Sequence, residues 1–223
     1  MAAPAITPVV SLLAASAADV DTDLLIVPVF EGESVPDLDG LDAATGGAVG
    51  RAIASGEVQG KPYDLFLTPA GNGWRASRVA LVGAGKADEY TPERVRRVAT
   101  AAALGARQRR IERIAWVHRG AIAPADGVRA AAEGLVLASF SGDTYKSSER
   151  GAPPPQQLAI IASRGADAAA LHAAVERGRI VAECCNLSRG LSNEPSNVLT
   201  PTTFAERAAA VARDAGLAAE ILD

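Results

Sequence analysis

The glycines beside Lys86 are the first residues whose types and spacing suggest chemistry. The run GAGK, Gly83 to Lys86, follows a strand-like apolar stretch, as a phosphate-binding loop would. Ala87, however, stands where that loop needs Ser or Thr, and Asp88 replaces the third glycine of a dinucleotide-binding turn. The sequence therefore predicts an ordinary turn at the end of a strand.

Histidines and carboxylates show no spacing typical of a metal site. His118 and His172 lie far apart, and neither has Cys, Asp or Glu at ligand spacing. We expect His118 on the surface at a strand end and His172 on a solvated helix face. The acidic residues near the N-terminus are expected to solvate loops; they are Asp19, Asp21, Asp23, Glu31, Glu33, Asp37, Asp39 and Asp42. With no G-x-S-x-G elbow either, the sequence nominates no catalytic, cofactor-binding or metal-binding residue.

A concentration of arginines is the main charge feature. Its members are Arg94, Arg96, Arg97, Arg107, Arg109, Arg110, Arg113 and Arg119. Several fall on the polar face of a predicted helix and in the loop after it, where phosphate contacts are possible. Aromatic residues that would stack on bases are not interleaved with them, so a solvated face or a contact with acidic residues of another subunit is favoured.

Composition limits the class of protein. The 223 residues have room for one large domain, or one domain plus a fragment, and the net charge of -4 gives no general attraction to nucleic acid or anionic membrane. No apolar run approaches the roughly 20 residues of a membrane span. No basic residue precedes Arg51, which argues against a secretory signal, and the only cysteines are the adjacent Cys184 and Cys185. We expect a soluble cytoplasmic protein without membrane partners.

Apolar runs alternate with helical patterns over residues 1–165. Leu24 to Phe30 is continuously apolar, as in a strand covered on both faces, with Val9 to Leu13 as a candidate partner. Asn72-Gly73 separates strand-like Tyr63 to Thr68 from Arg78 to Val82 and indicates an antiparallel hairpin. The other expected elements are helices at Leu41 to Ser55, from Thr91-Pro92 and at Asp126 to Ser139, strands at Ile111 to His118 and Leu158 to Ser163, and an exposed loop at Ser141 to Gln157. The predicted fold class is α/β, with a mixed sheet flanked by helices.

The rest of the chain predicts a connector and the start of a second domain. The helical pattern from Asp167 to Leu191 has two apolar faces, so we expect this helix to be covered on two sides. Thr200-Pro201 opens another helix with a buried stripe that includes Phe204 and Val211. Leu217 to Leu222 is expected to form the first strand of a further sheet.

Three segments resemble landmarks of the leucyl aminopeptidases, also called cytosol aminopeptidases. The most specific is NEPSNVLTP, Asn193 to Pro201, which is similar to the family's N-x-P-x-N-x-L-T-P junction. Val82 to Lys86, and Glu133 to Phe140 before a polar loop containing lysine, resemble family landmarks in the same order. The resemblance covers nearly the whole chain.

The resemblance implies a two-domain subunit. Residues 1–165 would form a macro-domain-like N-terminal domain, 166–192 a connector helix, and 193–223 the beginning of the metallopeptidase catalytic domain, a stub of a second α/β domain. The family binds two divalent metals, manganese or zinc, through Lys, Asp and Glu residues that lie beyond Asp223, and its N-T-D-A-E-G-R-L signature is missing here. No catalytic or metal position is therefore carried over, and we expect the chain alone to be inactive.

The resemblance also implies partners. Family subunits form homohexamers with peripheral N-terminal domains, and some members bind DNA through this region. The favoured hypothesis is the N-terminal, assembly or regulatory part of a cytosolic aminopeptidase that hydrolyses peptides only with its catalytic domain. The alternative is a stand-alone macro-like module for nucleotide or nucleic-acid ligands.

Overall fold

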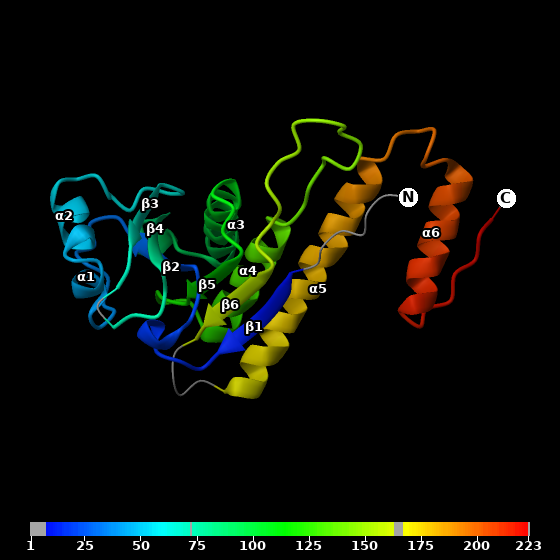
Figure 1. The fold of residues 1–223 in the computed structure, drawn as a ribbon. Coiled ribbons are helices and arrows are strands. Elements are labelled where there is room, and N and C mark those ends of the chain that lie inside the picture. The colour runs from blue at the N-terminus through cyan, green and yellow to red at the C-terminus, as the bar shows by residue number, and fades with distance from the viewer. Residues whose placement is uncertain (1–7, 72, 163–166, 223) are drawn as a thin grey trace.

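One mixed sheet forms the centre of the molecule in the computed structural model, which describes residues 8–71, 73–162 and 167–222 (Figure 1). The strand order is β1-β6-β5-β2-β4-β3, and neighbours are parallel except for the antiparallel pair β3 and β4. The strands are β1 (Val9–Leu13), β2 (Leu24–Phe30), β3 (Leu65–Pro69), β4 (Arg78–Gly85), β5 (Arg113–Val117) and β6 (Gln157–Ile161). The predicted mixed α/β fold and antiparallel pair are confirmed, although Asn72 of the predicted turn and Ser163 of the last predicted strand lie outside the described residues.

The predicted pairing of the first two strands is wrong. β1 pairs with β6 at the edge of the sheet, and β2 lies between β5 and β4. Alternate residues of β2 enter two cores, with Leu24 and Ile26 on one face and Leu25 and Val27 on the other. A strand that is apolar at every position is stable where both faces are covered, whereas half-exposed β1 suits an edge.

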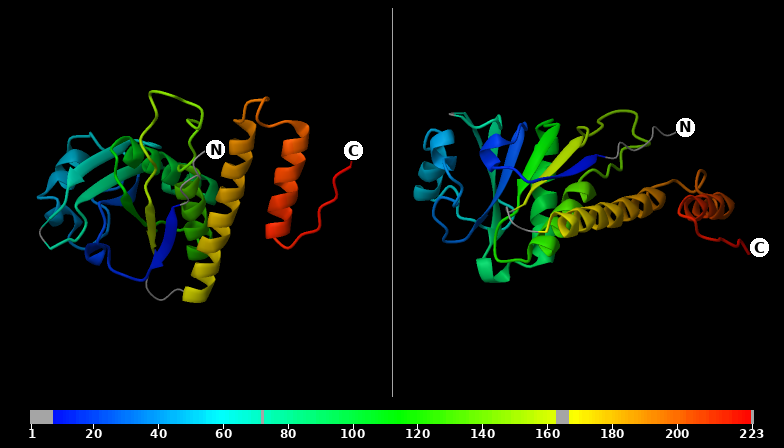
Figure 2. Two further views of the ribbon diagram at one scale, coloured as in Figure 1. Left: turned by 45° about the vertical axis from the view of Figure 1, so that its right-hand side comes forward. Right: turned by 90° about the horizontal axis from the view of Figure 1, so that it is seen from below.

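Helices cover the two faces of the sheet unequally (Figures 1 and 2). The larger core contains α3 (Pro92–Gln108), α4 (Pro124–Leu137) and α5 (Ala168–Ser192), whereas the other face carries the short α1 (Leu41–Ala44) and α2 (Ala48–Ala54). The single helix expected at Leu41 to Ser55 is thus divided in two. Gly46 and Gly47 take positive φ angles of 60° and 77°, which a continuous right-handed helix does not allow.

Local start signals and small residues explain how the helices form and pack. The Thr91 side chain accepts a hydrogen bond from the Arg94 amide, and Pro92 occupies the first turn of α3, as predicted. A Cβ atom at Gly134 would lie 2.2 Å from the Arg96 oxygen, and one at Gly178 would lie 2.3 Å from the Arg129 oxygen. These two glycines therefore let α3, α4 and α5 approach each other closely.

The outer face of α5 is exposed, contrary to the expectation of cover on two sides. Leu171, Val175, Gly178 and Ala182 are buried, and α5 packs chiefly on α4. On the opposite face Ile180 and Leu187 are each 46% exposed, beside the free, exposed cysteines at 184 and 185. Among the described residues, only one side of this helix is covered.

The segment after α5 forms a helix but buries none of it. α6 (Pro201–Asp214) begins where Thr200-Pro201 predicts, yet Phe204 is 49% exposed and Val211 48% exposed, so the predicted buried stripe is wrong for this chain. Leu217 to Leu222 is not a strand either: residues 217–222 have no strand partner. A strand needs a neighbour for its backbone hydrogen bonds, and Figure 1 shows α6 standing apart from the sheet.

Candidate functional site at the α5–α6 junction

The junction between α5 and α6 is the most specific motif of the sequence and is an ordered turn. Asn193 caps the C-terminus of α5 through its backbone amide, which donates to the Arg189 oxygen at 3.0 Å. The amides of Val198 and Leu199 both donate to the Pro195 oxygen, at 2.9 and 3.0 Å. The Thr200 side chain then caps α6 by accepting from the Thr203 amide at 3.2 Å. The junction motif therefore sets where α5 ends and where α6 begins.

Side chains tie this junction to the loop that follows α4. The Asn193 side-chain amide donates to the Gly142 oxygen at 3.1 Å, and the Tyr145 hydroxyl donates to Glu194. Glu194 also accepts from Arg207 of α6 at 3.1 Å, with its own side chain only 14% exposed. We call Tyr145, Asn193, Glu194 and Arg207 the junction clamp; it joins the loop after α4 to the junction and to α6, about 50 residues further along the chain.

A second set of contacts fixes the last turns of α5 on the end of α4. The Asn186 side chain donates to the Val136 oxygen at 2.9 Å, and the Arg189 guanidinium donates to the Leu137 oxygen at 3.3 Å. The same guanidinium lies 4.0 Å from the centroid of the Phe140 ring, a cation–π distance. Two sequence landmarks, the segment ending at Phe140 and the junction, are thus neighbours in the fold (Figure 1).

The hydrogen bonds also set the protonation of the clamp. The bond from Tyr145 lowers the pKa of Glu194, and the same bond raises the pKa of Tyr145. Glu194 is thus held as the anion that both Tyr145 and Arg207 require. This arrangement can position a helix, and the raised pKa of Tyr145 keeps its hydroxyl protonated rather than activating it as a nucleophile.

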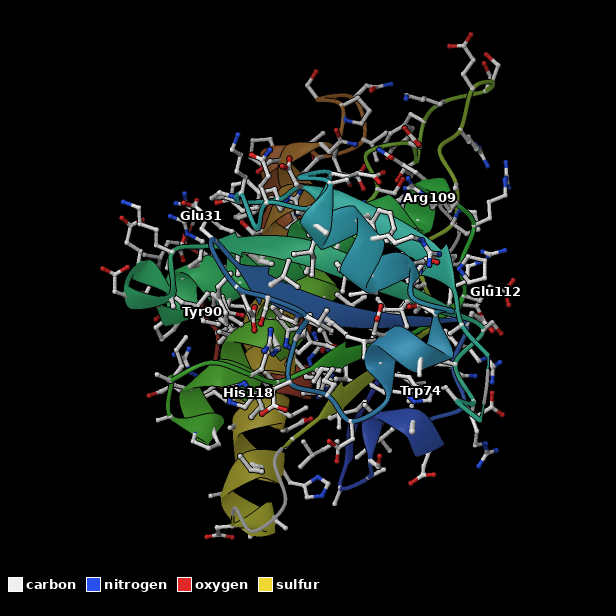
Figure 3. The ribbon with its side chains drawn as sticks, turned by 90° about the vertical axis from the view of Figure 1, so that its left-hand side faces the viewer. Glu31, Trp74, Tyr90, Arg109, Glu112 and His118 are labelled. Atoms are coloured by element: carbon white, nitrogen blue, oxygen red, sulfur yellow. The ribbon has the colours of Figure 1, made fainter. Side chains whose placement is uncertain are left out.

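His118 is buried, so its predicted place on the surface is wrong. Its exposed fraction is 8%, and a Cβ atom at Gly127 would lie 2.1 Å from the His118 Cε1 atom, so the ring packs against the first turns of α4 (Figure 3). Burial lowers the pKa of His118. The side chain of residue 118 points to the same face as Trp116, where the helices cover it, whereas His172 is exposed as expected.

The arginines do not form one free basic surface. Five of the eight are paired with carboxylates of the chain: Arg94 with Glu89, Arg96 and Arg97 with Glu93, Arg113 with Asp21 and Asp23, and Arg119 with Glu33. Arg113 starts β5 and Arg119 follows its end, so they lie at opposite ends of the strand. Several of the N-terminal acids therefore hold the fold together rather than only solvating loops.

The glycines of GAGK serve strand pairing. A Cβ atom at Gly83 would lie 1.7 Å from the Lys61 oxygen, so the approach of residues 60–62 needs glycine there. The amides of Gly83 and Gly85 donate to the Asp64 and Gly60 oxygens at 2.8 and 2.9 Å, which leaves them unable to hold a phosphate. The predicted turn is therefore placed too early, because Gly83 to Gly85 still belong to β4 and the chain turns only at residues 86–89.

The site residues that sequence reasoning missed are Tyr145 and Arg207. Tyr145 lies in a polar loop without periodicity, and Arg207 is one of several charges on α6. Neither has a local signal, because only the tertiary fold brings them to Glu194. Elsewhere, in residues 8–71, 73–162 and 167–222, no three His, Cys, Asp or Glu side chains converge as a metal site would require.

No helix in the described part of the chain is long and apolar enough to cross a membrane.

Comparison with known proteins agrees with the junction motif. The family described as "Cytosol aminopeptidase family, N-terminal domain" matches residues 26–149. A probable cytosol aminopeptidase of Solibacter usitatus is 38% identical over 92% of this chain and 40% of its own length, and one of Syntrophotalea carbinolica is 33% identical over 91% and 42%. The chain thus spans about two-fifths of the length of these curated relatives.

Solved structures show the same fold. A mutant of tomato leucine aminopeptidase superposes with a TM-score of 0.80 at 22% identity, covering 96% of this chain and 43% of that chain. The bottromycin maturation enzyme BotP superposes with a TM-score of 0.68 at 25% identity, covering 88% of this chain and 38% of that one. With the family match extending over more than half of its residues, the chain belongs to the cytosol aminopeptidase family.

Proposed function

We propose that this chain is the N-terminal, assembly or regulatory part of a cytosolic leucyl aminopeptidase. The complete enzyme would release N-terminal amino acids from peptides with the help of two divalent metals, manganese or zinc. Family membership and relatives named probable cytosol aminopeptidases support this proposal. The division into a domain at 1–165, a connector at 166–192 and the start of a catalytic domain at 193–223 belongs to the same proposal.

The observation that carries the proposal is the exposed apolar surface of α5 and α6. Ile180, Leu187, Phe204 and Val211 are each 46–49% exposed and lie on two consecutive helices. Full burial of one such side chain contributes about 1.5–3 kcal/mol, so covering the exposed half of each would add about half of that amount per side chain. In the proposed enzyme, the polypeptide corresponding to the remainder of the relatives covers this surface.

The chain's own residues then position α6 rather than perform a reaction. The junction clamp holds the junction against the loop after α4 and ties the middle of α6 to it through Arg207, and so sets the direction in which a following domain begins. The described residues do not fit the two metals, because no suitable ligands converge among them. We therefore assign no step of peptide hydrolysis to this chain, and place its contribution in subunit assembly, with a homohexamer as the proposed state.

The alternative of a nucleotide- or nucleic-acid-binding module has no specific observation in its favour. The arginines that motivated it are largely paired with carboxylates, and the GAGK amides are used in strand pairing. Salt-dependent binding that falls when Arg109, Arg110 and Arg113 are changed to Ala would revive it.

A chimera tests the proposal. The matched N-terminal region of the Solibacter usitatus relative is replaced by this chain, and hydrolysis of Leu-p-nitroanilide is measured with manganese. We expect activity from the chimera and none from the 223-residue chain alone. Hydrolysis by the pure chain, abolished by a chelator, would contradict the proposed division of labour.

A further inference from the structure

A hollow on the less covered face of the sheet has the dimensions of a small-molecule site. Its volume is about 550 Å³, and it is lined by the segment 15–18, the turn 37–39, Trp74 and the residues at the carboxyl ends of β5 and β6. Ligand sites in proteins are commonly about 300–1,000 Å³. In open sheets with parallel strands, ligands bind outside the carboxyl ends of the strands, which is where Val117, Ile161 and Ala162 place this hollow.

The lining has a definite chemical character. Three of its lining residues, Ala17, Val117 and Ile161, are apolar and belong to the smaller core. Trp74 forms one side, and its indole nitrogen lies 3.5 Å from the position of a Cβ atom on Gly40, so the ring borders the turn that carries Asp37 and Asp39 (Figure 3). A ligand in the hollow would meet an aromatic ring and two carboxylates together.

The charged residues that line the hollow indicate whether it would bind a cation or an anion. Neither Asp37 nor Asp39 has an ion pair or side-chain hydrogen bond in the described chain, whereas Asp21, Asp23 and Glu33 are paired with arginines. No Lys or Arg is among the described residues that line the hollow. His118 is also a lining residue, but its ring packs against Gly127 of α4, on the side of the larger core. An anion such as a phosphate would therefore be repelled, and a cation would be attracted.

We propose that this hollow binds a small organic ammonium compound with a flat apolar body. The ammonium group would lie between the Asp37 and Asp39 carboxylates and the Trp74 ring, and the apolar body would contact Ala17, Val117 and Ile161. Carboxylates attract the charge, and a tryptophan ring adds a cation–π attraction within about 6 Å. This inference is independent of the aminopeptidase proposal, because it uses no residue of the junction.

The test uses the two tryptophans of the chain as probes. The indole N–H signals of Trp74 and of fully buried Trp116 are followed by NMR during titration with 2-phenylethylammonium, and a Trp74→Phe variant assigns them. We expect a saturable shift of the Trp74 signal while the Trp116 signal stays in place. Neutral 2-phenylethanol should bind about tenfold more weakly, and anionic phenylacetate should not bind.

A charge-matched pair of variants completes the test. Asp37→Asn with Asp39→Asn should weaken ammonium binding about tenfold or more, whereas Asp88→Asn with Asp214→Asn, which removes equal charge elsewhere, should leave it unchanged. The proposal is overturned if no saturable shift occurs, if the alcohol binds as well as the amine, or if both double variants behave alike. Should the first double variant fail to fold, the comparison of amine with alcohol on the unaltered chain still decides.

Discussion

α3 and α6 show what a helix gains from its surroundings. Both begin with Thr-Pro, both have the threonine side chain as N-cap, and both carry an apolar stripe. α3 buries seven residues against the sheet and α4, whereas no residue of α6 is buried. Local sequence therefore specifies where each helix starts and ends, but burial of its stripe needs a partner.

The largest change in stability is expected at Trp116, which belongs to the same core as the buried residues of α3. It is fully buried in the larger core. Trp116→Ala should lower the free energy of unfolding by about 3–5 kcal/mol, because it removes apolar contacts and leaves a cavity. Denaturant unfolding followed by circular dichroism measures this. A loss below about 1 kcal/mol would show that the core is not packed as described.

The next largest effect is expected from two glycines of α5, whose substitution by alanine should change the stability of the chain in opposite directions. Gly178→Ala should destabilise the chain by about 1–3 kcal/mol, since the new methyl group would meet the Arg129 oxygen. The methyl group added by Gly190→Ala has no atom within 4 Å, so this substitution should stabilise the helix by about 0.5–1 kcal/mol. Thermal unfolding of both variants compares them directly. Equal effects would mean that α5 does not lie closely on α4.

The junction clamp should affect the order of α6 more than global stability. The folded pKa of Glu194 is lowered, so its bonds to Tyr145 and Arg207 are present above the ordinary carboxyl pKa and are lost as the pH falls through the folded value. Tyr145→Phe should therefore loosen α6 at neutral pH, with Tyr63→Phe as a control outside the clamp. Amide ¹⁵N relaxation of residues 201–214 reports this, and an α6 equally ordered in both variants would contradict it.

The smallest effect is expected on α6 itself. Phe204→Ala should change the free energy of unfolding of the 223-residue chain by no more than about 0.5 kcal/mol, because the ring is half exposed. The same substitution in the chimera should lower the free energy of unfolding by about 2 kcal/mol or more if the ring is covered there. Chemical denaturation of both proteins measures the difference, and equal costs would mean that the ring has the same surroundings in both.

Much of the fold follows from sequence, for identifiable reasons. The apolar run at Leu24 to Phe30 predicts a central strand, and Thr91-Pro92 predicts the start of α3 to the residue. The partner of β1 could not be predicted, because pairing depends on the order of strands in space. The break at Gly46-Gly47 depends on backbone angles that a helical pattern alone does not reveal.

The candidate site could be predicted only in part. The junction motif marks its position at Asn193 to Pro201, but Tyr145 and Arg207 reach Glu194 through tertiary structure alone. The wrong prediction for His118 has a similar cause. α4 packs over the end of β5, and the sequence around one histidine does not indicate that contact. Residues whose role depends on contacts distant in sequence carry little local signal.

Hydrogen exchange of the α6 amides in the 223-residue chain and in the chimera tests the central claim most directly. We predict weak protection of residues 201–214 in the chain, since nothing in the described structure buries them, and strong protection in the chimera, where a following domain covers them. Equal protection of these amides in the two proteins would contradict the proposal that a catalytic domain covers α6 in the complete enzyme.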